Sequence, residues 1–262
     1  MPFHHTLQGS RFELKYLIDE NCARVVRDFT ACHLEPDEHA LHRPNFEYPV
    51  HSLYLDTPDL ALCRATLHGE RNRFKLRIRF YDEDPAKPAF FEIKRRLDNV
   101  IIKRRAAVRG PSVQQILAGH LPAWSDLQEP GANNLGTLHR FCGLTGAIGA
   151  EGRIIVSYMR EAYVTPNDNA VRVTFDRGLA VRRYRSGSPR GGDEPLVNVD
   201  LGRVILEIKF TDRFPFWLGE MVRTFNLQRC SMAKYVACLQ ELTRPGIPLG
   251  RSYRPGRVEV RL

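Results

Sequence analysis

Short segments in which apolar and polar residues alternate recur along most of the chain. In residues 73–81, RFKLRIRFY, the apolar residues Phe74, Leu76, Ile78 and Phe80 are separated by charged or polar ones. A period of two predicts a β-strand with one apolar and one polar face. Similar runs predict further strands at residues 11–18, 50–56, 89–96, 99–108, 153–164, 170–183 and 203–210.

Fewer segments have helical spacing. Asp19 is placed to cap a helix that continues to about His33, with Ala23, Val26 and Phe29 on one face. Further helices are predicted after Thr57-Pro58 at residues 59–66, at residues 112–119 with Ser112 as cap, near residues 135–142, at residues 214–227, and at residues 232–242 with Ser231 as cap. Residues 34–49 and 184–202 are rich in polar residues and turn formers, and we expect loops there.

Strands outnumber helices in this pattern, and strands and helices do not alternate as βαβ units. The pattern therefore favours an α+β fold, with one antiparallel domain and helices packed outside it. The first ten residues and residues 243–262 are expected to be flexible ends.

The charge of the chain indicates an anionic partner. Lys and Arg number 39 and Asp and Glu 30, which gives a formal net charge of +9. Such a balance is typical of proteins that meet nucleic acid, phosphate compounds or an acidic membrane surface. The 6 cysteines have no C-x-x-C spacing, so neither a zinc site nor a disulfide framework is expected.

The sequence indicates no route into or across a membrane. The N-terminal segment lacks the apolar run of a signal peptide, and no apolar stretch approaches the roughly 20 residues that span a bilayer. We therefore expect a cytoplasmic protein without a membrane span.

The polar faces of the predicted strands are rich in Lys and Arg, with isolated Glu. For any single strand, the ordinary interpretation is a half-buried sheet with a solvated polar face. The opposite faces, however, carry large apolar residues, and amphipathic helices are available to cover them. This combination favours a closed barrel with a charged interior, which requires a counter-anion such as polyphosphate. Carboxylates in that interior would be explained by a divalent metal that bridges to phosphate oxygens.

Specific segments resemble a known family. These occur in the family's order: RFELKY (11–16), SLYLDTPDL (52–60), KLRIRFY (75–81), FFEIKRR (90–96), SYMREAY (157–163), VRVTFD (171–176), LEIKF (206–210) and MAKY (232–235). They resemble VTC domains, the polyphosphate polymerase domains of the triphosphate tunnel metalloenzyme (CYTH-like) superfamily. The resemblance covers residues 11–242 and implies a single tunnel domain.

The resemblance implies an eight-stranded antiparallel β-barrel that encloses a cationic tunnel. It also implies an enzyme that moves the γ-phosphate of ATP onto phosphate or polyphosphate, with Mn²⁺ or Mg²⁺ as cofactor. The expected partners are ATP, phosphate and polyphosphate, and not nucleic acid.

The resemblance also assigns site residues by position. Catalytic roles are implied for Lys15, Arg77, Arg79, Lys94, Arg160, Arg172 and Lys234. Substrate-binding roles are implied for Lys103, Arg105, Tyr158, Lys209 and Ser231. Glu207 is the implied metal ligand, assisted by Glu13 or Glu92.

The chain departs from the family pattern at two places. The superfamily signature Glu-x-Glu-x-Lys reads Arg11-x-Glu13-x-Lys15 here, and loss of the first carboxylate favours a polymerase over a hydrolase. Ala233 stands before Lys234, where the family often has serine.

Three alternatives remain open from the sequence. The first is an inorganic triphosphatase or nucleoside triphosphatase of the same fold, and the second is a non-catalytic polyphosphate-binding module. The third, RNA binding, is disfavoured because the phenylalanines are expected on the apolar strand faces, where they could not stack on bases.

Overall fold

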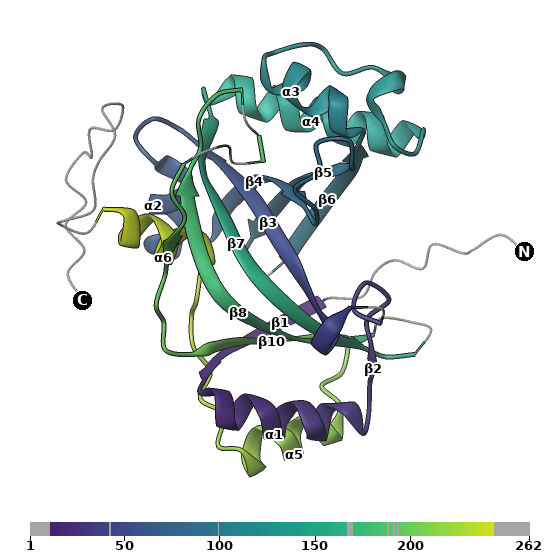
Figure 1. The fold of residues 1–262 in the computed structure, drawn as a ribbon, viewed down its shortest axis with the longest axis vertical. Helices are drawn as coiled ribbons and strands as arrows, with labels where there is room; N and C mark the ends of the chain where they lie inside the picture. Colours follow the sequence, from purple (N-terminus) through teal and green to yellow (C-terminus); the bar gives the residue numbers. More distant parts are fainter. Residues whose placement is uncertain are drawn as a thin grey trace, which may run out of the picture. The chain divides into compact units, whose positions relative to one another are not determined.

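The fold is α+β, with a large antiparallel sheet and helices packed against it (Figure 1). The structure is a computed structural model that describes residues 11–41, 43–98, 100–166, 170–187, 189–190, 192 and 194–243. The ends that were predicted to be flexible lie outside these residues, except for Thr243. Among the described residues, no helix is long and apolar enough to cross a bilayer.

All the strands predicted from the sequence are present. They are β1 (Arg11–Ile18), β3 (Glu47–Asp56), β4 (Asn72–Phe80), β5 (Ala89–Leu97), β6 (Val100–Val108), β7 (Glu151–Val164), β8 (Val171–Arg183) and β10 (Val204–Thr211). They are hydrogen-bonded in the order β1-β10-β8-β7-β3-β4-β5-β6, and the short strands β2 (Glu35–Pro36) and β9 (Val197–Asn198) pair with β7 and β8. Because this order ends at β1 and β6, the sheet of the described residues is not closed, and the predicted barrel is not confirmed.

The described residues form two compact units. Unit 1 contains residues up to 49, 158–179 and 200–232, and unit 2 contains residues 50–157, 180–199 and those from 233 onward. Strands β3, β7 and β8 each begin in one unit and end in the other. The single domain expected over residues 11–242 stays a prediction.

The core of unit 1 lies between its strands and the helices α1 (Glu20–Ala31) and α5 (Phe216–Thr224). Asp19 caps α1 as predicted, because its carboxylate accepts a hydrogen bond of 2.8 Å from the backbone N–H of Cys22. The apolar faces of β10 and of both helices meet in a buried cluster that includes Val26, Leu206, Leu218 and Met221. Figure 1 shows α1 and α5 side by side below β1 and β10.

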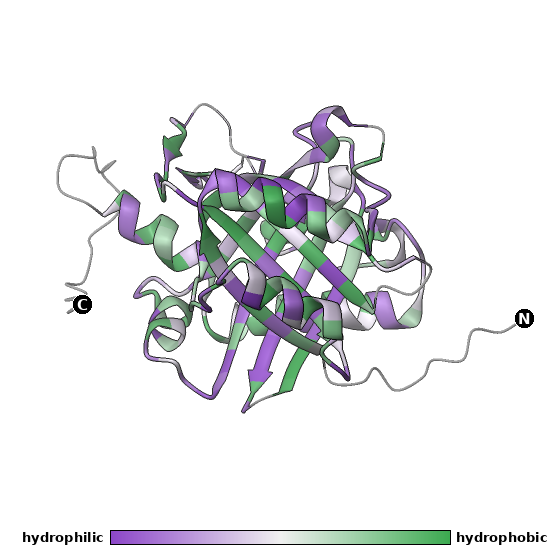
Figure 2. Ribbon diagram, turned by 90° about the horizontal axis from the view of Figure 1, so that it is seen from below, coloured by the Kyte–Doolittle hydropathy of each residue, from purple (hydrophilic) through white to green (hydrophobic). Residues whose placement is uncertain are grey.

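The core of unit 2 lies beneath α3 (Gly110–Leu117) and α4 (Ala132–Ala147). Phe91 of β5 meets Phe141 of α4 edge to face, with ring centroids 5.0 Å apart. Hydrophobic and hydrophilic bands alternate along the strands (Figure 2), as expected for strands with two different faces. The apolar residues of β4, β5 and β6 pack in one cluster with residues of α3 and α4, so these helices cover the apolar face. Helix α4 is longer than predicted, because packing against β5 and β6 stabilises a glycine- and asparagine-containing segment whose own helix propensity is low.

Three predicted helix starts are wrong. Helix α3 begins at Gly110 with Pro111 in its first turn, so Ser112 is inside the helix rather than its cap. The last helix, α6 (Lys234–Leu242), has Ala233 at its N-cap position, so Ser231 does not cap it. Helix α2 (Ala61–Leu67) begins after Leu60, which has a left-handed backbone with φ of 61°, and not at Thr57-Pro58.

The two predicted loops contain more order than expected. The first contains β2, a 3-10 turn (Pro44–Phe46) and the start of β3, and the second contains β9. Another 3-10 turn lies at Trp124–Asp126. These elements are too short for a hydrophobic period to show in the sequence.

Candidate functional site

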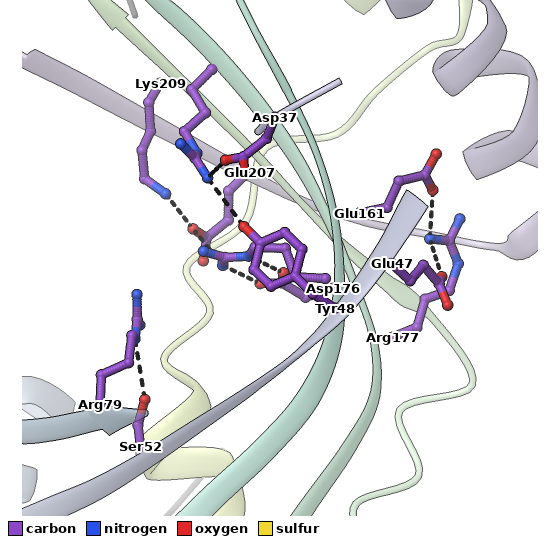
Figure 3. Close-up of polar contacts among 12 residues, drawn as sticks. Asp37, Glu47, Tyr48, Ser52, Arg79, Glu161, Asp176, Arg177, Glu207 and Lys209 are labelled. Carbon is purple, nitrogen blue, oxygen red and sulfur yellow. Dashed lines mark hydrogen bonds and ion pairs between the residues drawn. The ribbon is translucent and has the colours of Figure 1, made fainter. Parts of the chain in front are cut away.

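Glutamate and lysine alternate across the paired strands β1 and β10 in unit 1. The register places Glu13 opposite Lys209 and Lys15 opposite Glu207. The ammonium nitrogen of Lys15 lies 3.2 Å from a carboxylate oxygen of Glu13 and 3.6 Å from one of Glu207. Lys209 donates a hydrogen bond of 2.8 Å to Glu207 (Figure 3). We call these four residues the β1–β10 cluster.

Burial disfavours the protonated form of Lys209. It lowers the pKa of Lys209 to about 8, although the carboxylates of Glu207 and Glu13 act in the opposite direction. At a pH near or above 8, the side chain can therefore gain a proton when additional negative charge approaches.

Arg160 of β7 is held by Asp176 of β8. Its Nε and Nη2 atoms donate to the two carboxylate oxygens of Asp176, at 2.6 and 2.7 Å. Burial opposes the charge, but Asp176 raises the pKa of Arg160 well above its usual range. The guanidinium also lies 3.9 Å from Glu207 and 5.2 Å from the ring centre of Tyr158, so the predicted Tyr158–Arg160 pair adjoins the β1–β10 cluster.

Arg172 of β8 is engaged by residues from a part of the chain that was expected to be a loop. It donates to the carboxylate of Asp37, and to the hydroxyl of Tyr48 at 3.2 Å. Asp37 is 2% exposed, so the interaction fixes the arginine from a buried position.

The β1–β10 cluster fits a divalent cation better than any other set of implied ligands. Glu13 and Glu207 both direct a carboxylate oxygen at the Lys15 ammonium, so a positive charge is already accommodated between them. Two carboxylates completed by phosphate oxygens are a common ligand set for Mg²⁺ and Mn²⁺. Among the described residues, however, no three His, Cys, Asp or Glu side chains converge.

A second polar surface lies on β4, β5 and β6 of unit 2. The registers align Arg77, Glu92 and Arg105 in one row across the three strands, and Lys75, Lys94 and Lys103 in the next. We call these six residues the β4–β6 cluster. Five of them are cationic, and like charges directly opposite one another are destabilising in a sheet.

Glu92 is the carboxylate around which these cations gather. Its oxygens lie 2.6 Å from Arg77, 2.8 Å from Lys103 and 3.5 Å from Arg105. Burial opposes its ionisation, but Arg77, Arg79 and Lys103 hold the pKa of Glu92 well below its usual range. Burial also lowers the pKa of Lys103 to about 8. This environment favours a counter-ion role for Glu92 over the metal-ligand role implied by the resemblance.

Two aromatic residues belong to this surface although neither was among the predicted site residues. Phe90 lies on the same strand face as Glu92, and the guanidinium carbon of Arg105 is 3.6 Å from its ring centre. Arg105 also donates a hydrogen bond of 3.4 Å to the hydroxyl of Tyr81. The expectation that the phenylalanines lie on the apolar faces is therefore wrong for Phe90.

The remaining implied residues have separate positions. The Nε of Arg79 donates to Ser52 at 3.4 Å (Figure 3). Lys234 is the first residue of α6 and is buried at 8% exposure, where the helix dipole opposes its positive charge. Ser231 is exposed in the segment between α5 and α6.

The structure thus assembles most implied residues into the two clusters and adds partners that sequence reasoning missed. The missed residues are Asp37, Tyr48, Asp176, Ser52, Tyr81 and Phe90. Asp176 shares a strand face with Arg172, and that alternation was the one signal that could have indicated its role. Asp37 lies in an irregular segment and had no such signal.

Comparison with known proteins finds one family. Residues 10–243 match the family model described as "VTC domain". No curated protein matches the chain.

Two solved structures have distant similarity to this chain. The PH1819 protein from Pyrococcus horikoshii OT3 has 14% identity and a TM-score of 0.45, covering 88% of this chain and 98% of its own. A chain of the Schizosaccharomyces pombe Mediator head module has 8% identity and a TM-score of 0.39, covering 83% and 91%.

Proposed function

Because the chain belongs to the VTC domain family, within the triphosphate tunnel metalloenzyme (CYTH-like) fold, we propose that it is a polyphosphate polymerase-type phosphotransferase. The reaction moves the γ-phosphate of ATP onto phosphate or a polyphosphate end and releases ADP. The closed eight-stranded tunnel of that fold is part of the proposal.

The observation that supports the proposal best is the β4–β6 cluster. Lys75, Lys94 and Lys103 are cross-strand neighbours, and Arg77 and Arg105 flank the carboxylate of Glu92. A linear polyanion is the ligand that matches such a surface, because each phosphate can accept charge-assisted hydrogen bonds from several cations. Binding would also relieve the repulsion between lysines that face one another.

The described residues have distinct roles in this proposal. Phosphoryl transfer asks little covalent chemistry of a protein, so catalysis here consists of positioning and charge neutralisation. Because the acceptor is already an anion, the reaction needs no strong general base. The arginines that bind phosphate oxygens are Arg77, Arg79, Arg160 and Arg172, the lysines that neutralise charge are Lys15, Lys94, Lys103 and Lys234, and further substrate contacts come from Arg105, Tyr158, Lys209 and Ser231.

Glu13 and Glu207 are the residues that would hold Mn²⁺ or Mg²⁺. Such an ion supplies charge neutralisation on the phosphates when it is bound. The ammonium group of Lys15 contacts both of these carboxylates.

The purified chain, incubated with ATP and either Mn²⁺ or Mg²⁺, tests this function. The proposal expects ADP together with polyphosphate that is resolved as a ladder on a gel. Release of phosphate without polymer would instead establish a triphosphatase or nucleoside triphosphatase. Binding of polyphosphate without turnover of ATP would establish a non-catalytic binding module.

A further inference from the structure

A cavity lies on the helix-covered side of the sheet in unit 2. It has a volume of about 1260 Å³, and its apolar wall includes Leu55, Phe91 and Phe141. Phe91 and Glu92 are successive residues of β5, so their side chains point to opposite faces of the strand. None of the β4–β6 cluster residues lines the cavity, which makes it separate from the proposed polyphosphate surface.

Arg153 of β7 brings an incompletely satisfied positive charge to the cavity wall. Its Nε donates a hydrogen bond of 3.1 Å to the backbone oxygen of Asp56. Its Nη2 is buried and makes no hydrogen bond among the described residues, and a carboxylate oxygen of Glu151 lies 3.8 Å from it. Buried donors of this kind are rare in native proteins, and an acceptor group on a ligand would satisfy this one.

Two glycines on α4 leave space for the cavity. Gly143 and Gly146 both line it, and a Cβ atom added at either position would have no neighbour within 4 Å. Glycine is a poor helix former, so glycines in this helix lower its stability while they leave room beside it. Figure 1 shows α4 beside α3 at the β5–β6 side of the sheet.

We propose that this cavity binds a small organic anion, with its acidic group on Arg153 and its apolar body against Leu55, Phe91 and Phe141. The cavity is larger than the roughly 300–1,000 Å³ of most small-molecule sites, so it has room for such a ligand, and it combines an apolar wall with a charged anchor, as such sites commonly do. The acidic group can be a carboxylate or a phosphate monoester, since both accept two hydrogen bonds from a guanidinium.

The fluorescent anion 1-anilinonaphthalene-8-sulfonate, titrated into the folded full chain, tests this site. Saturable binding at one site per chain is expected, with near-UV circular dichroism showing that the protein stays folded. Gly143→Leu places a bulky side chain at the cavity wall and adds a better helix former, so it should weaken binding at least tenfold without lowering the melting temperature.

Gly136→Leu is the matched control. Gly136 lies in the same helix, also has no neighbour within 4 Å of an added Cβ, and does not line the cavity. It should leave probe binding unchanged. Equal binding by the two leucine variants, or no saturable binding by the wild type, would overturn the site.

Arg153→Met tests the anion anchor, with the exposed Arg140→Met of α4 as its control. Binding should fall about tenfold for the first variant and stay unchanged for the second. Unchanged binding by Arg153→Met would refute the role of the arginine. If that variant does not fold, the paired leucine variants still decide whether the cavity is the site.

Competition then identifies the acidic group. Displacement of the probe by decanoate assigns a carboxylate ligand, and displacement by adenosine monophosphate assigns a phosphate monoester. Displacement by neither overturns the small-anion assignment. These measurements use no ATP or metal, so their outcome is independent of the polymerase assay.

Discussion

At the scale of single residues, Asp56 illustrates how much one buried carboxylate organises. It is fully buried at the end of β3 and accepts hydrogen bonds from the backbone N–H groups of Thr57, Leu62 and Cys63, at 2.8, 2.9 and 2.9 Å. The hydroxyl of Tyr235 donates a further bond of 2.8 Å. Asp56 therefore holds the start of α2 and connects it to α6.

Replacement of Asp56 should destabilise the protein without altering the chemistry. Asp56→Asn removes the negative charge and places an amide NH₂ group, itself a donor, against the N–H and O–H donors that Asp56 accepts from. We therefore expect a loss of about 3 kcal/mol in the free energy of unfolding. Tyr235→Phe removes one hydrogen bond and should cost about 1 kcal/mol. Urea denaturation measures both, and the exposed Asp28→Asn should leave the midpoint nearly unchanged. A fully stable Asp56→Asn would show that the capping contacts contribute little.

Glu207 and Glu92 should respond differently to removal of their charge. Glu207→Gln takes away the implied metal ligand, and we expect polymer synthesis to fall by roughly 100-fold or more. Metal-free binding of polyphosphate should persist, because the variant has one negative charge fewer near Lys15 and Lys209. Activity assays over a range of Mn²⁺ concentrations check this, and undiminished synthesis by Glu207→Gln would exclude the metal role.

Glu92→Gln serves as the comparison for that experiment. Because Glu92 neutralises Arg77 and Lys103, its replacement should lower thermal stability, and added polyphosphate should restore part of it. If Glu92→Gln changed the metal requirement in the same way as Glu207→Gln, that result would contradict the counter-ion role of Glu92.

At the scale of the elements, strand pairing places two lysines where their pKa is lowered. Lys209 on β10 and Lys103 on β6 each lie beside a glutamate, and loss of hydration lowers the pKa of each to about 8 from an ordinary value of 10.5, although 44% of the Lys103 side chain is exposed. Between these two pH values the unfolded chain holds more protons at these sites than the folded chain. Their contribution to stability therefore rises with pH across this window.

Polyphosphate affinity should change in the opposite direction. The ligand requires the ammonium form, so affinity is expected to decline as pH rises above about 8, and binding there should take up protons. Calorimetry in buffers of different ionisation enthalpy measures that uptake. A variant with both Lys103→Arg and Lys209→Arg should show a flatter pH profile, whereas an identical profile would assign the effect to other groups.

Elements also show why sequence reasoning was more accurate for strands than for helices. Alternation along a strand is local, so the charged residues on the polar faces of β1, β4, β5, β8 and β10 were assigned correctly, although Phe90 of β5 was not. The start of α2 depends on Asp56, and the length of α4 depends on its packing against β5 and β6. Those contacts are made by residues that the helix patterns themselves do not include.

At the scale of the whole molecule, the net charge of +9 makes binding of a polyanion sensitive to salt. Counterion release predicts a linear decline of log affinity with log salt concentration. We expect polyphosphate affinity to fall on the order of 100-fold or more between 50 and 200 mM salt, by analogy with proteins that make several phosphate contacts. Fluorescence anisotropy with labelled polyphosphate measures this slope.

A single-stranded RNA of equal charge provides the control. The two clusters consist of charged residues, and Phe90 and Tyr81 are the aromatic residues that lie beside Arg105. RNA should therefore compete weakly, because these surfaces offer few aromatic side chains on which its bases could stack. RNA also carries less charge per unit length than polyphosphate. Equal competition by RNA would favour the nucleic-acid alternative.

The sequence by itself determined where the eight long strands form, which of their faces are charged, and the family to which the chain belongs. These properties depend on local alternation and on residue order, and both are present before the chain folds. Only the tertiary structure decided the ionic partners of these residues. Asp176 pairs with Arg160, Asp37 pairs with Arg172, and several cations surround Glu92. It also decided that Gly143 and Arg153 border a cavity. Contacts of this kind join residues far apart in the chain, so no periodicity in the sequence records them.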